Sequence, residues 1–484
     1  MSGKTGEVSL STKLFYGFGS ITYGAKDNGF SYFILLFYSQ VLGLSPAMTS
    51  LALFLALCFD AISDPAVGHI SDNLHSRWGR RHPFMYASCI PIMICYYFAW
   101  HPPLDLTERQ LFWYLVVFAI LVRTFVTMYE IPSTSLVAEL TDDYDERTKM
   151  LSYRYFFGWW GGLTMAVCAY LVFMRDTPDY PDGMLNPHGW GNYGTMAAIM
   201  MGVGILVSSL GTHKHIPNLK SPPPKEKFSL TRSVSQLLET LANRSFLALF
   251  ISALLFAVGA GVSTTLNIYF SRYFWGLAQW QITFMPMSNF LSAGIALFLA
   301  PMLTARSDKR SVAIKLWIFA VLFLPVPVLL RLIGFFPPNG TNLLLVLLVI
   351  HSLIEVTMLI IGGILISSMV ADIVEDSEKK TGRRSEGLFF AARSFAAKAV
   401  NGLGILFAGL ILELIRFPVG AKVGEVPERT LTSLGLVYVP TIIIFYLLAV
   451  YAMTFYRITR GGHSDNLDII GSHAKAEPGQ TPAE

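Results

Sequence analysis

Charged side chains are scarce in this chain of 484 residues: only 14% are Asp, Glu, Lys or Arg, while 53% are hydrophobic. Soluble domains carry about 25% charged residues, so a shortage of this size excludes an ordinary soluble protein. The formal net charge of +4 is small, and the basic residues gather in short loops between long apolar runs. Such a pattern reports orientation in a membrane. We therefore expect a lipid bilayer as partner and no nucleic acid.

Cysteine is scarce too, and the usual signatures of catalysis are missing. The four cysteines all lie inside apolar runs, without the paired spacing of disulfides or metal ligands. No nucleophile–base pair or phosphate-binding loop stands out, so we predict no enzyme and no cofactor beyond a coupling ion. No cleavable signal peptide is visible, because the first dozen residues are polar and Lys26 and Asp27 interrupt the first apolar run.

Long apolar runs dominate the chain instead. A membrane-spanning helix needs about 20 mostly apolar residues, and we trace twelve runs of that kind. We therefore predict an all-α membrane protein with twelve transmembrane helices. The runs are Leu14–Leu42, Met48–Ile70, Phe84–Trp100, Leu111–Ile131, Tyr155–Met174, Tyr193–Leu210, Phe246–Phe270, Ile282–Leu303, Leu316–Leu330, Leu343–Val374, Leu388–Ile415 and Leu434–Tyr456.

The distribution of Lys and Arg predicts the orientation of these helices. The loop after the second run holds Arg77, Arg80 and Arg81, and the linker after the sixth run is rich in lysine, whereas the first loop has no basic residue. By the positive-inside rule, both termini and the linker then face the cytoplasm. We divide the chain into a six-helix half (1–210), a cytoplasmic linker (211–245), a second six-helix half (246–460) and a disordered cytoplasmic tail (461–484).

A short internal repeat supports two related halves. The segment Val137–Asp143 reads VAELTDD and follows the fourth run, whereas Val370–Asp376 reads VADIVED and follows the tenth. The offset of 233 residues (370 − 137) is close to half the chain. Tandem halves are typical of secondary transporters, whose substrate and ion sites lie between the halves near the middle of the membrane.

Two aspartates stand where a spanning helix should hold no charge. Asp60 and Asp64 lie four residues apart on one helix face, with Ser63 beside them. A helix that begins near Pro46 brings Asp60 roughly 21 Å deep, near mid-membrane. Two carboxylates this close repel each other in a low dielectric, so the site must bind a monovalent cation or keep a proton, and oxygen ligands suit Na⁺. A structural ion-pair network between helices is the alternative.

Further charges within the runs predict a polar solute. Lys26 and Asp27 interrupt the first run, Glu130 precedes Pro132 in the fourth, and Lys398 lies within the eleventh. Carboxylates that face a polar cavity can accept hydrogen bonds from sugar hydroxyls, although an internal salt bridge of Lys26 with a neighbouring acid fits as well. Lys398 needs an acidic partner inside the membrane, and the aspartate pair is our candidate.

A third set of charges lies in the loops that we place at the cytoplasmic face. Asp72 ends the second helix and three arginines precede the next, so charge-assisted pairing can latch this face. Acids after the fourth and tenth runs offer complementary charges, although a merely solvated loop is the alternative. We assign the gate to Asp72, Arg77, Arg80, Arg81, Asp142, Asp372 and Glu375.

Together these motifs resemble the glycoside–pentoside–hexuronide:cation symporter family of the major facilitator superfamily, whose best-known member is melibiose permease. The similarity extends over nearly the whole chain, and no single motif carries it. It rests on Asp60–Pro65, Ser76–Arg80, Glu130–Pro132, Val370–Val374 and Thr381–Gly387, the last of which runs on to Lys398.

The resemblance implies a cation site and an adjacent sugar site. Ser63 stands where melibiose permease has asparagine, which leaves Na⁺ and H⁺ open as coupling ions, and Thr134 stands where it has a tryptophan, which leaves the sugar open. The same branch contains the sodium-dependent lysophosphatidylcholine symporters of animals, so a lysolipid is an alternative substrate. The implied residues are Asp60, Ser63, Asp64 and Thr127 for the cation, and Asp27, Glu130 and Arg154 for the sugar, with Lys26 and Lys398 in support.

We therefore predict a secondary active transporter of the bacterial inner membrane. A cation held by Asp60 and Asp64, either Na⁺ or H⁺, is coupled to symport of a sugar or glycoside by alternating access, and we expect a monomer. A cation-coupled lysophospholipid symporter and a non-transporting membrane sensor are the alternatives.

Overall fold

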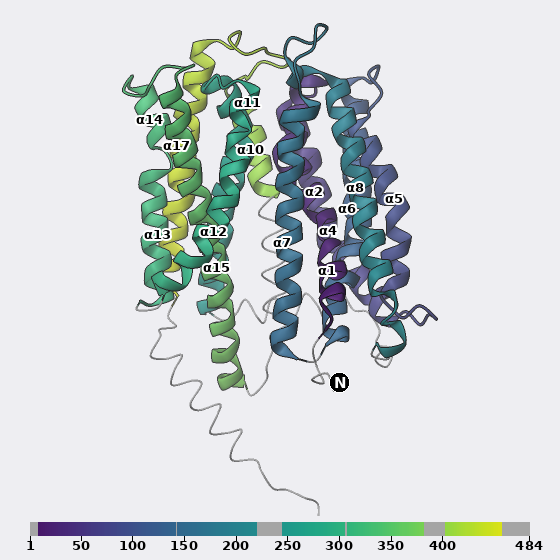
Figure 1. The fold of residues 1–484 in the computed structure, drawn as a ribbon. Helices are drawn as coiled ribbons and strands as arrows, with labels where there is room; N and C mark the ends of the chain where they lie inside the picture. The colour runs from purple at the N-terminus through teal and green to yellow at the C-terminus, as the bar shows by residue number, and fades with distance from the viewer. Residues whose placement is uncertain (1–7, 142, 220–243, 305–306, 382–401, 457–484) are drawn as a thin grey trace, which may run out of the picture. The chain divides into compact units, whose positions relative to one another are not determined.

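The structure is a computed structural model that describes residues 8–141, 143–219, 244–304, 307–381 and 402–456. These residues form helices and loops, with no strand among them. Figure 1 traces the labelled helices along the chain. Ten of the described helices are long and apolar enough to cross a membrane, and a shorter apolar helix covers Gly402–Leu414.

The first apolar run is a chain of short helical pieces. It consists of α1 (Leu10–Phe18), α2 (Ile21–Asn28), the π-helical η1 (Gly29–Phe33), α3 (Ile34–Leu36) and the π-helical η2 (Phe37–Val41). With this broken span and the helix at Gly402–Leu414, all twelve predicted spans are represented, and the twelve-helix architecture is confirmed.

The remaining spans follow the predicted order, several of them as two joined pieces. They are α4 (Pro46–Asn73), α5 (His82–Trp100), α6 (Glu108–Leu140), α7 (Tyr144–Cys168) with η3 (Ala169–Phe173), α8 (Pro187–His213), α10 (Arg244–Tyr269) with η6 (Phe270–Phe274), α11 (Gln279–Ile282) with α12 (Phe284–Thr304), α13 (Lys309–Phe323) with α14 (Val326–Leu332), α15 (Asn342–Thr381) and α17 (Glu428–Met453). Short 3₁₀ turns η4 (Gly183–Leu185) and η5 (Ile216–Asn218) flank α8.

Caps at the helix starts follow directly from the sequence. The Ser45 side chain accepts a hydrogen bond from the Met48 N–H at 3.2 Å, and Pro46 occupies the first helical position of α4. At the start of α6, Gln110 Oε1 accepts a hydrogen bond from the Thr107 N–H at 2.9 Å. These caps satisfy orphan N–H groups and fix where the two helices of the candidate site begin.

The chain divides into two compact units. Unit 1 comprises Met1–Phe228, Gly261–Met287 and Ile405–Leu434, and unit 2 comprises Ser229–Ala260, Ser288–Gly404 and Gly435–Glu484. Unit 1 therefore contains the first six spans together with pieces of later ones. The assignment of two six-helix halves as the moving parts of a transporter stays a prediction.

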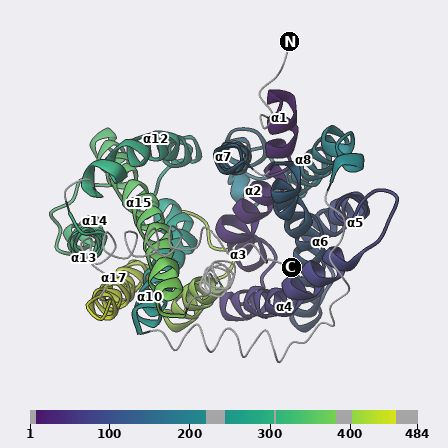
Figure 2. The same ribbon diagram turned by 90° about the horizontal axis from the view of Figure 1, so that it is seen from below.

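Within unit 1, α6 packs against both α4 and α5, and α2 packs against α7 (Figure 2). The α2–α7 contact is close, because a Cβ atom on Gly24 would lie 1.9 Å from the Gly158 carbonyl oxygen. Buried aromatic rings hold the second part of the first span, where Phe37 stacks on Trp100 with 5.2 Å between ring centroids. Trp100 in turn stacks on Trp190 of α8.

Unit 2 has an aromatic core of its own. Phe256 of α10 lies 5.4 Å from Trp317 of α13 and 5.1 Å from Tyr446 of α17, measured between ring centroids. The His351 ring of α15 stacks on Phe323 of α13 at 4.7 Å. Three spans of this unit are thus joined through one buried cluster, and a neighbouring ring contact ties α15 to α13.

Candidate cation and solute site

The two aspartates of the second span lie on α4 and face α6. Asp60 is 4% exposed, and its Oδ2 atom accepts a hydrogen bond from Arg123 Nη1 of α6 at 2.7 Å. One turn further along α4, Asp64 Oδ1 accepts a hydrogen bond from Thr127 Oγ1 at 2.8 Å. Both carboxylates therefore meet a polar partner on the same neighbouring helix.

Helices α4 and α6 pack in a constant register, in which each residue of α4 lies opposite the residue of α6 that follows it by 63 positions. Asp60 lies opposite Arg123 and Asp64 lies opposite Thr127. One turn on from there, a Cβ atom on Gly68 would lie 3.6 Å from Ile131. Residues four apart share a helix face, so a parallel packing in this register brings each pair together at successive turns.

The oxygen atoms around this seam fit a hard monovalent cation. Asp60 Oδ1 is buried, and among the described residues it has no hydrogen-bond partner. The Ser63 hydroxyl, 3.5 Å from the Asp60 backbone oxygen, and the Thr127 hydroxyl supply neutral oxygen atoms nearby. Carboxylate, hydroxyl and carbonyl oxygens are the ligands that hard cations prefer. The predicted cation residues Asp60, Ser63, Asp64 and Thr127 thus gather on adjacent turns of two helices.

Arg123 is a functional candidate that the motif reasoning missed. Its side chain is 8% exposed, and its guanidinium lies over the Phe30 ring of η1, 5.7 Å from the ring centroid. The signal was available in the sequence, because an arginine within an apolar run is costly unless it has a partner. Its partner is Asp60, so the structure contains an ion pair between α4 and α6 at this one aspartate, and whether its role is structural or functional stays a prediction.

The predicted sugar residues Glu130 and Arg154 pair with each other. Arg154 Nη2 of α7 donates to Glu130 Oε1 of α6 at 2.6 Å, and Arg154 Nη1 donates to Ser133 Oγ at 2.7 Å. Arg154 Nη2 also lies 3.0 Å from Thr134 Oγ1, and its guanidinium lies over the Tyr16 ring at 5.2 Å. Arg154 is therefore held by two elements besides its own, α6 and α1.

Lys26 and Asp27 lie on α2 and face different surroundings. The Lys26 side chain is 7% exposed and that of Asp27 is 37% exposed, with 3.4 Å between Lys26 Nζ and Asp27 Oδ1. Lys26 Nζ also lies 4.5 Å from the centroid of the Tyr23 ring. The internal salt bridge that we considered for Lys26 is thus confirmed. Lys398, its predicted companion, lies outside the described residues.

At the end of α4 and α6, two arginines share one buried acid. Arg80 Nε and Arg81 Nε donate to Glu139 Oε1 at 2.8 and 2.9 Å, and the Glu139 side chain is 3% exposed. Arg81 Nη2 also contacts Asp72 Oδ1 at 2.5 Å, and Arg81 Nη1 donates to Ser71 Oγ at 3.0 Å. The predicted gate residues Asp72, Arg80 and Arg81 therefore meet in one ion-pair network, whose central acid is Glu139.

Of the other predicted gate residues, only Arg77 has a described side chain, and it does not join this network. Arg77 has its guanidinium over the Trp78 ring at 5.5 Å, and it forms no ion pair with the described part of the chain. Asp142 lies outside the described residues. Asp372 and Glu375 belong to α15, but their side chains are likewise outside the description.

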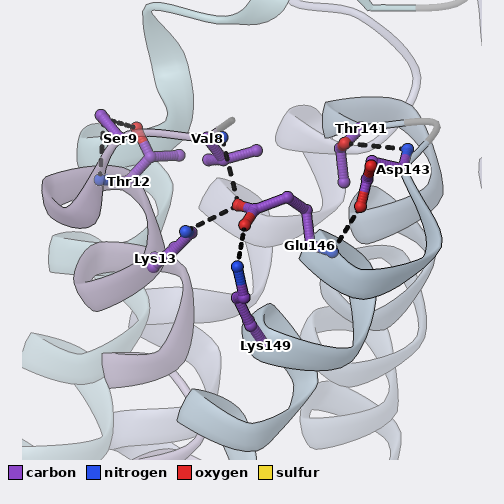
Figure 3. Close-up of polar contacts among 8 residues, drawn as sticks. All are labelled: Val8, Ser9, Thr12, Lys13, Thr141, Asp143, Glu146 and Lys149. Carbon is purple, nitrogen blue, oxygen red and sulfur yellow. Dashed lines mark hydrogen bonds and ion pairs between the residues drawn. The ribbon is translucent and has the colours of Figure 1, made fainter. Parts of the chain in front are cut away.

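A second buried acid lies at the start of α7. Glu146 accepts hydrogen bonds from Lys13 Nζ at 2.6 Å, from Lys149 Nζ at 2.8 Å and from the Val8 N–H at 3.2 Å (Figure 3). These donors lower the pKa of the Glu146 carboxyl to about 2. The Asp143 side chain caps the helix by accepting the Glu146 N–H at 2.8 Å. The N-terminal segment is thereby tied to α7.

The fold and these charged pairs define the class of the protein. Apolar helices that carry mutually paired charges within their spans are typical of integral membrane transporters. Residues 15–460 match the family model described as MFS/sugar transport protein. The chain belongs to this family of the major facilitator superfamily.

Known proteins resemble the chain, two of the three described here over most of its length. The putative glycoside/cation symporter YagG of Escherichia coli is 24% identical and aligns over 93% of this chain and 94% of its own. The sodium-dependent lysophosphatidylcholine symporter 1 of Gallus gallus is 31% identical, but over only 30% of this chain and 28% of its own. A structure of the xylose transporter XylE from E. coli, in an inward-open conformation, shares the fold with a TM-score of 0.62 and 15% identity, covering 95% of this chain and 99% of that one.

Proposed function

We propose that this protein couples the entry of a monovalent cation to symport of a sugar or glycoside across the bacterial inner membrane. The single observation that carries the proposal is the sharing of α6 by the two sites. Thr127, which contacts the candidate cation site, and Glu130, which contacts Arg154, lie three residues apart on this helix. Residues three apart are neighbours on a helix surface, so an ion at one site can influence the other.

In the proposed cycle, a cation binds the oxygens of Asp60 and Asp64, together with the hydroxyls of Ser63 and Thr127. Occupancy changes the charge facing α6 by one unit, which alters the packing of the helix that carries Glu130. The glycoside relative and the family description support a sugar as solute.

A sugar would be held by charge-assisted hydrogen bonds. Glu130 can accept from hydroxyls through Oε2, which is buried and has no hydrogen-bond partner in the described part of the chain. The planar guanidinium of Arg154 can donate hydrogen bonds to sugar oxygens, and the Asp27 carboxylate, whose side chain is 37% exposed, can accept a further one. We assign Lys26 and Lys398 a supporting part through their positive charge.

The network of Asp72, Arg80, Arg81 and Glu139 is the proposed gate. Its arginines belong to the loop that the positive-inside rule places in the cytoplasm, together with both termini. Alternating access requires such a latch to form in one conformation and break in the other. We propose that Arg77, Asp142, Asp372 and Glu375 contribute to the same face.

Solute uptake into membrane vesicles tests this function. A thermal-shift screen of purified protein against sugars and lysophospholipids, with Na⁺, Li⁺ and pH varied, first identifies a ligand. Uptake of that ligand is then measured with and without Na⁺ and proton gradients, in the wild type and in the variants Asp60→Asn and Asp64→Asn.

We expect gradient-driven accumulation in the wild type, and its loss in both variants while they remain folded. Uptake that ignores both gradients and survives both substitutions would reject coupling at this site. A thermal shift with lysophospholipid and with no sugar would instead favour the lipid alternative. Saturable binding without accumulation would indicate a sensor.

A further inference from the structure

The candidate cation site already contains a positive charge of the protein's own. Arg123 donates from Nη1 to Asp60 Oδ2 at 2.7 Å, and both side chains are less than a tenth exposed. A guanidinium stays protonated in proteins. The three side chains Asp60, Asp64 and Arg123 therefore carry a formal charge of −1 together, where the two acids alone would carry −2.

The position of this guanidinium matters for any ion that binds here. It occupies one oxygen of Asp60 and leaves Oδ1, which is buried without a hydrogen-bond partner among the described residues. A cation that bridges Asp60 and Asp64 must then either accept a positive neighbour a few ångströms away or displace it. Like charges at such distances repel strongly in a partly buried site.

The Arg123 guanidinium also has a second favourable contact, with an aromatic ring. Its guanidinium lies over the face of Phe30, 5.7 Å from the ring centroid, and its Nε has no hydrogen-bond partner within the described ranges. An aromatic face attracts a cation, so the side chain retains a favourable contact with η1 if it releases Asp60. With one hydrogen bond to the acid and an adjacent ring, the guanidinium can leave Asp60 without losing all of its favourable contacts.

We propose that Arg123 is a tethered cation whose charge opposes binding of the coupling cation at the pair Asp60 and Asp64 and thereby sets the affinity of the site for monovalent ions. This inference rests on the proposed cation-coupled function and names a residue that determines its ion affinity. A purely structural ion pair between α4 and α6 would stabilise the fold without weakening the binding of an ion.

Charge-matched variants separate these two possibilities. Asp60→Asn raises the formal charge of the cluster from −1 to 0, and the double variant Asp60→Asn/Arg123→Gln returns it to −1 without a buried unpaired guanidinium. Arg123→Gln alone lowers it to −2, and Arg123→Lys keeps it at −1. Arg109→Gln removes an exposed arginine from the first turn of the same helix and serves as the control.

Equilibrium binding of radioactive Na⁺ to purified protein measures the effect, with Li⁺ as competitor and the elution profile as a check of folding. We expect the double variant to bind Na⁺ about tenfold or more tightly than Asp60→Asn. Arg123→Gln should bind about tenfold or more tightly than the wild type, whereas Arg123→Lys and Arg109→Gln should stay close to it. The comparison of the double variant with Asp60→Asn holds even if Arg123→Gln alone does not fold.

Two results would overturn the inference. One is a double variant that is folded but binds Na⁺ no more tightly than Asp60→Asn. The other is the absence of Na⁺ binding in the wild type and in every variant. Failure of the proposed function is separate, because it is judged by whether wild-type uptake responds to a Na⁺ or a proton gradient.

Discussion

At the scale of single residues, two buried acids, Glu139 and Glu146, each accept hydrogen bonds from more than one donor. Glu139 accepts from two arginines, and Glu146 accepts from two lysines and a backbone N–H. A buried carboxylate is costly unless hydrogen bonds and opposite charge compensate for its lost hydration. Glu139 therefore binds the segment before α5 to α6, and Glu146 binds the N-terminal segment to α7.

Glu146 gives a pH dependence with a defined sign. Its pKa in the folded protein is about 2, below the ordinary value of 4.5. The stabilisation that it provides is then fully present above about pH 4.5 and is lost as the pH falls toward 2. The difference in Tm between the wild type and Glu146→Gln should be constant from neutral pH to about pH 5 and should narrow below about pH 4.5. Thermal unfolding of purified protein measures it.

An exposed glutamate provides the control for this titration. Glu425→Gln should leave Tm unchanged across the same range, because Glu425 is solvent-exposed. A wild-type to Glu146→Gln difference that persists undiminished well below pH 4 would contradict the assigned pKa. Faster tryptic cleavage after Lys13 in Glu146→Gln provides an independent reading of the same tie.

Sequence reasoning located acids better than their partners. The spacing of Asp60 and Asp64 predicts a shared face, and the structure places both against α6. The same rule about intramembrane charge applies to Arg123, but pairing it with Asp60 requires the register of α4 on α6. Glu139 lies in the repeated segment, yet only the packing of α5 on α6 decides that this acid, and not its neighbours, meets Arg80 and Arg81.

At the scale of helices, hydropathy predicts where spans lie but not how far they extend. The fourth run was predicted to end at Ile131, whereas α6 continues through Pro132 to Leu140. Apolar character ends near the membrane surface, while the helix continues beyond it into the charged network at Glu139. The broken first span was also not predicted, because π-helical turns such as η1 depend on contacts with neighbouring helices.

The α2–α7 contact provides a test of helix packing. A methyl group on Gly24 would lie 1.9 Å from the Gly158 carbonyl oxygen, and backbone cannot rotate away as a side chain can. Gly24→Ala should therefore destabilise the protein by about 1–3 kcal/mol despite the better helix propensity of alanine. It should also weaken solute binding, since α2 carries Lys26 and Asp27.

A second glycine at the same contact serves as the matched control. A Cβ atom on Gly158 would meet nothing closer than the Ser20 carbonyl oxygen at 3.5 Å, an ordinary van der Waals distance. Gly158→Ala should therefore keep the wild-type Tm or exceed it. Equal Tm values for the two alanine variants would show that α2 and α7 can separate at little cost.

At the scale of the whole molecule, contacts within unit 1 join the first six spans to segments far along the sequence. Ser39 shares a buried hydrogen bond of 2.7 Å with Tyr269, and Gln279 Nε2 donates to the Tyr170 carbonyl at 2.9 Å. Arg272 forms an ion pair with Asp182, in the loop before α8. Figure 1 shows α11 at the end away from α1. These contacts belong to unit 1, and the division of the chain into two six-helix halves at the central linker stays a prediction.

This ion pair has one buried and one accessible partner, which predicts unequal effects of removing them. The Arg272 side chain is 4% exposed and that of Asp182 is 21% exposed. Asp182→Asn keeps a capping oxygen for the Met184 N–H but removes the ion-pair partner of a buried guanidinium, which retains its contact with the Tyr273 ring, so it should cost about 1–3 kcal/mol. Arg272→Gln leaves a carboxylate that water can reach, and it should cost less. Thermal unfolding of both variants and of their double variant measures the asymmetry.

The same pair also bears on alternating access, which requires this end to open in part of the cycle. In the proposed orientation the end faces the periplasm, and weakening the pair shifts the population toward the outward-open state. Ser271, 3% exposed and next to Arg272, reports on this opening when changed to cysteine. A membrane-impermeant maleimide should label Ser271→Cys faster in the Arg272→Gln background than in the wild type, after subtraction of labelling at the native cysteines. Removing an ion pair that holds this end closed must increase the exposure of the neighbouring Ser271→Cys side chain. Equal labelling rates in both backgrounds would therefore mean that the ion pair stabilises the fold without controlling access.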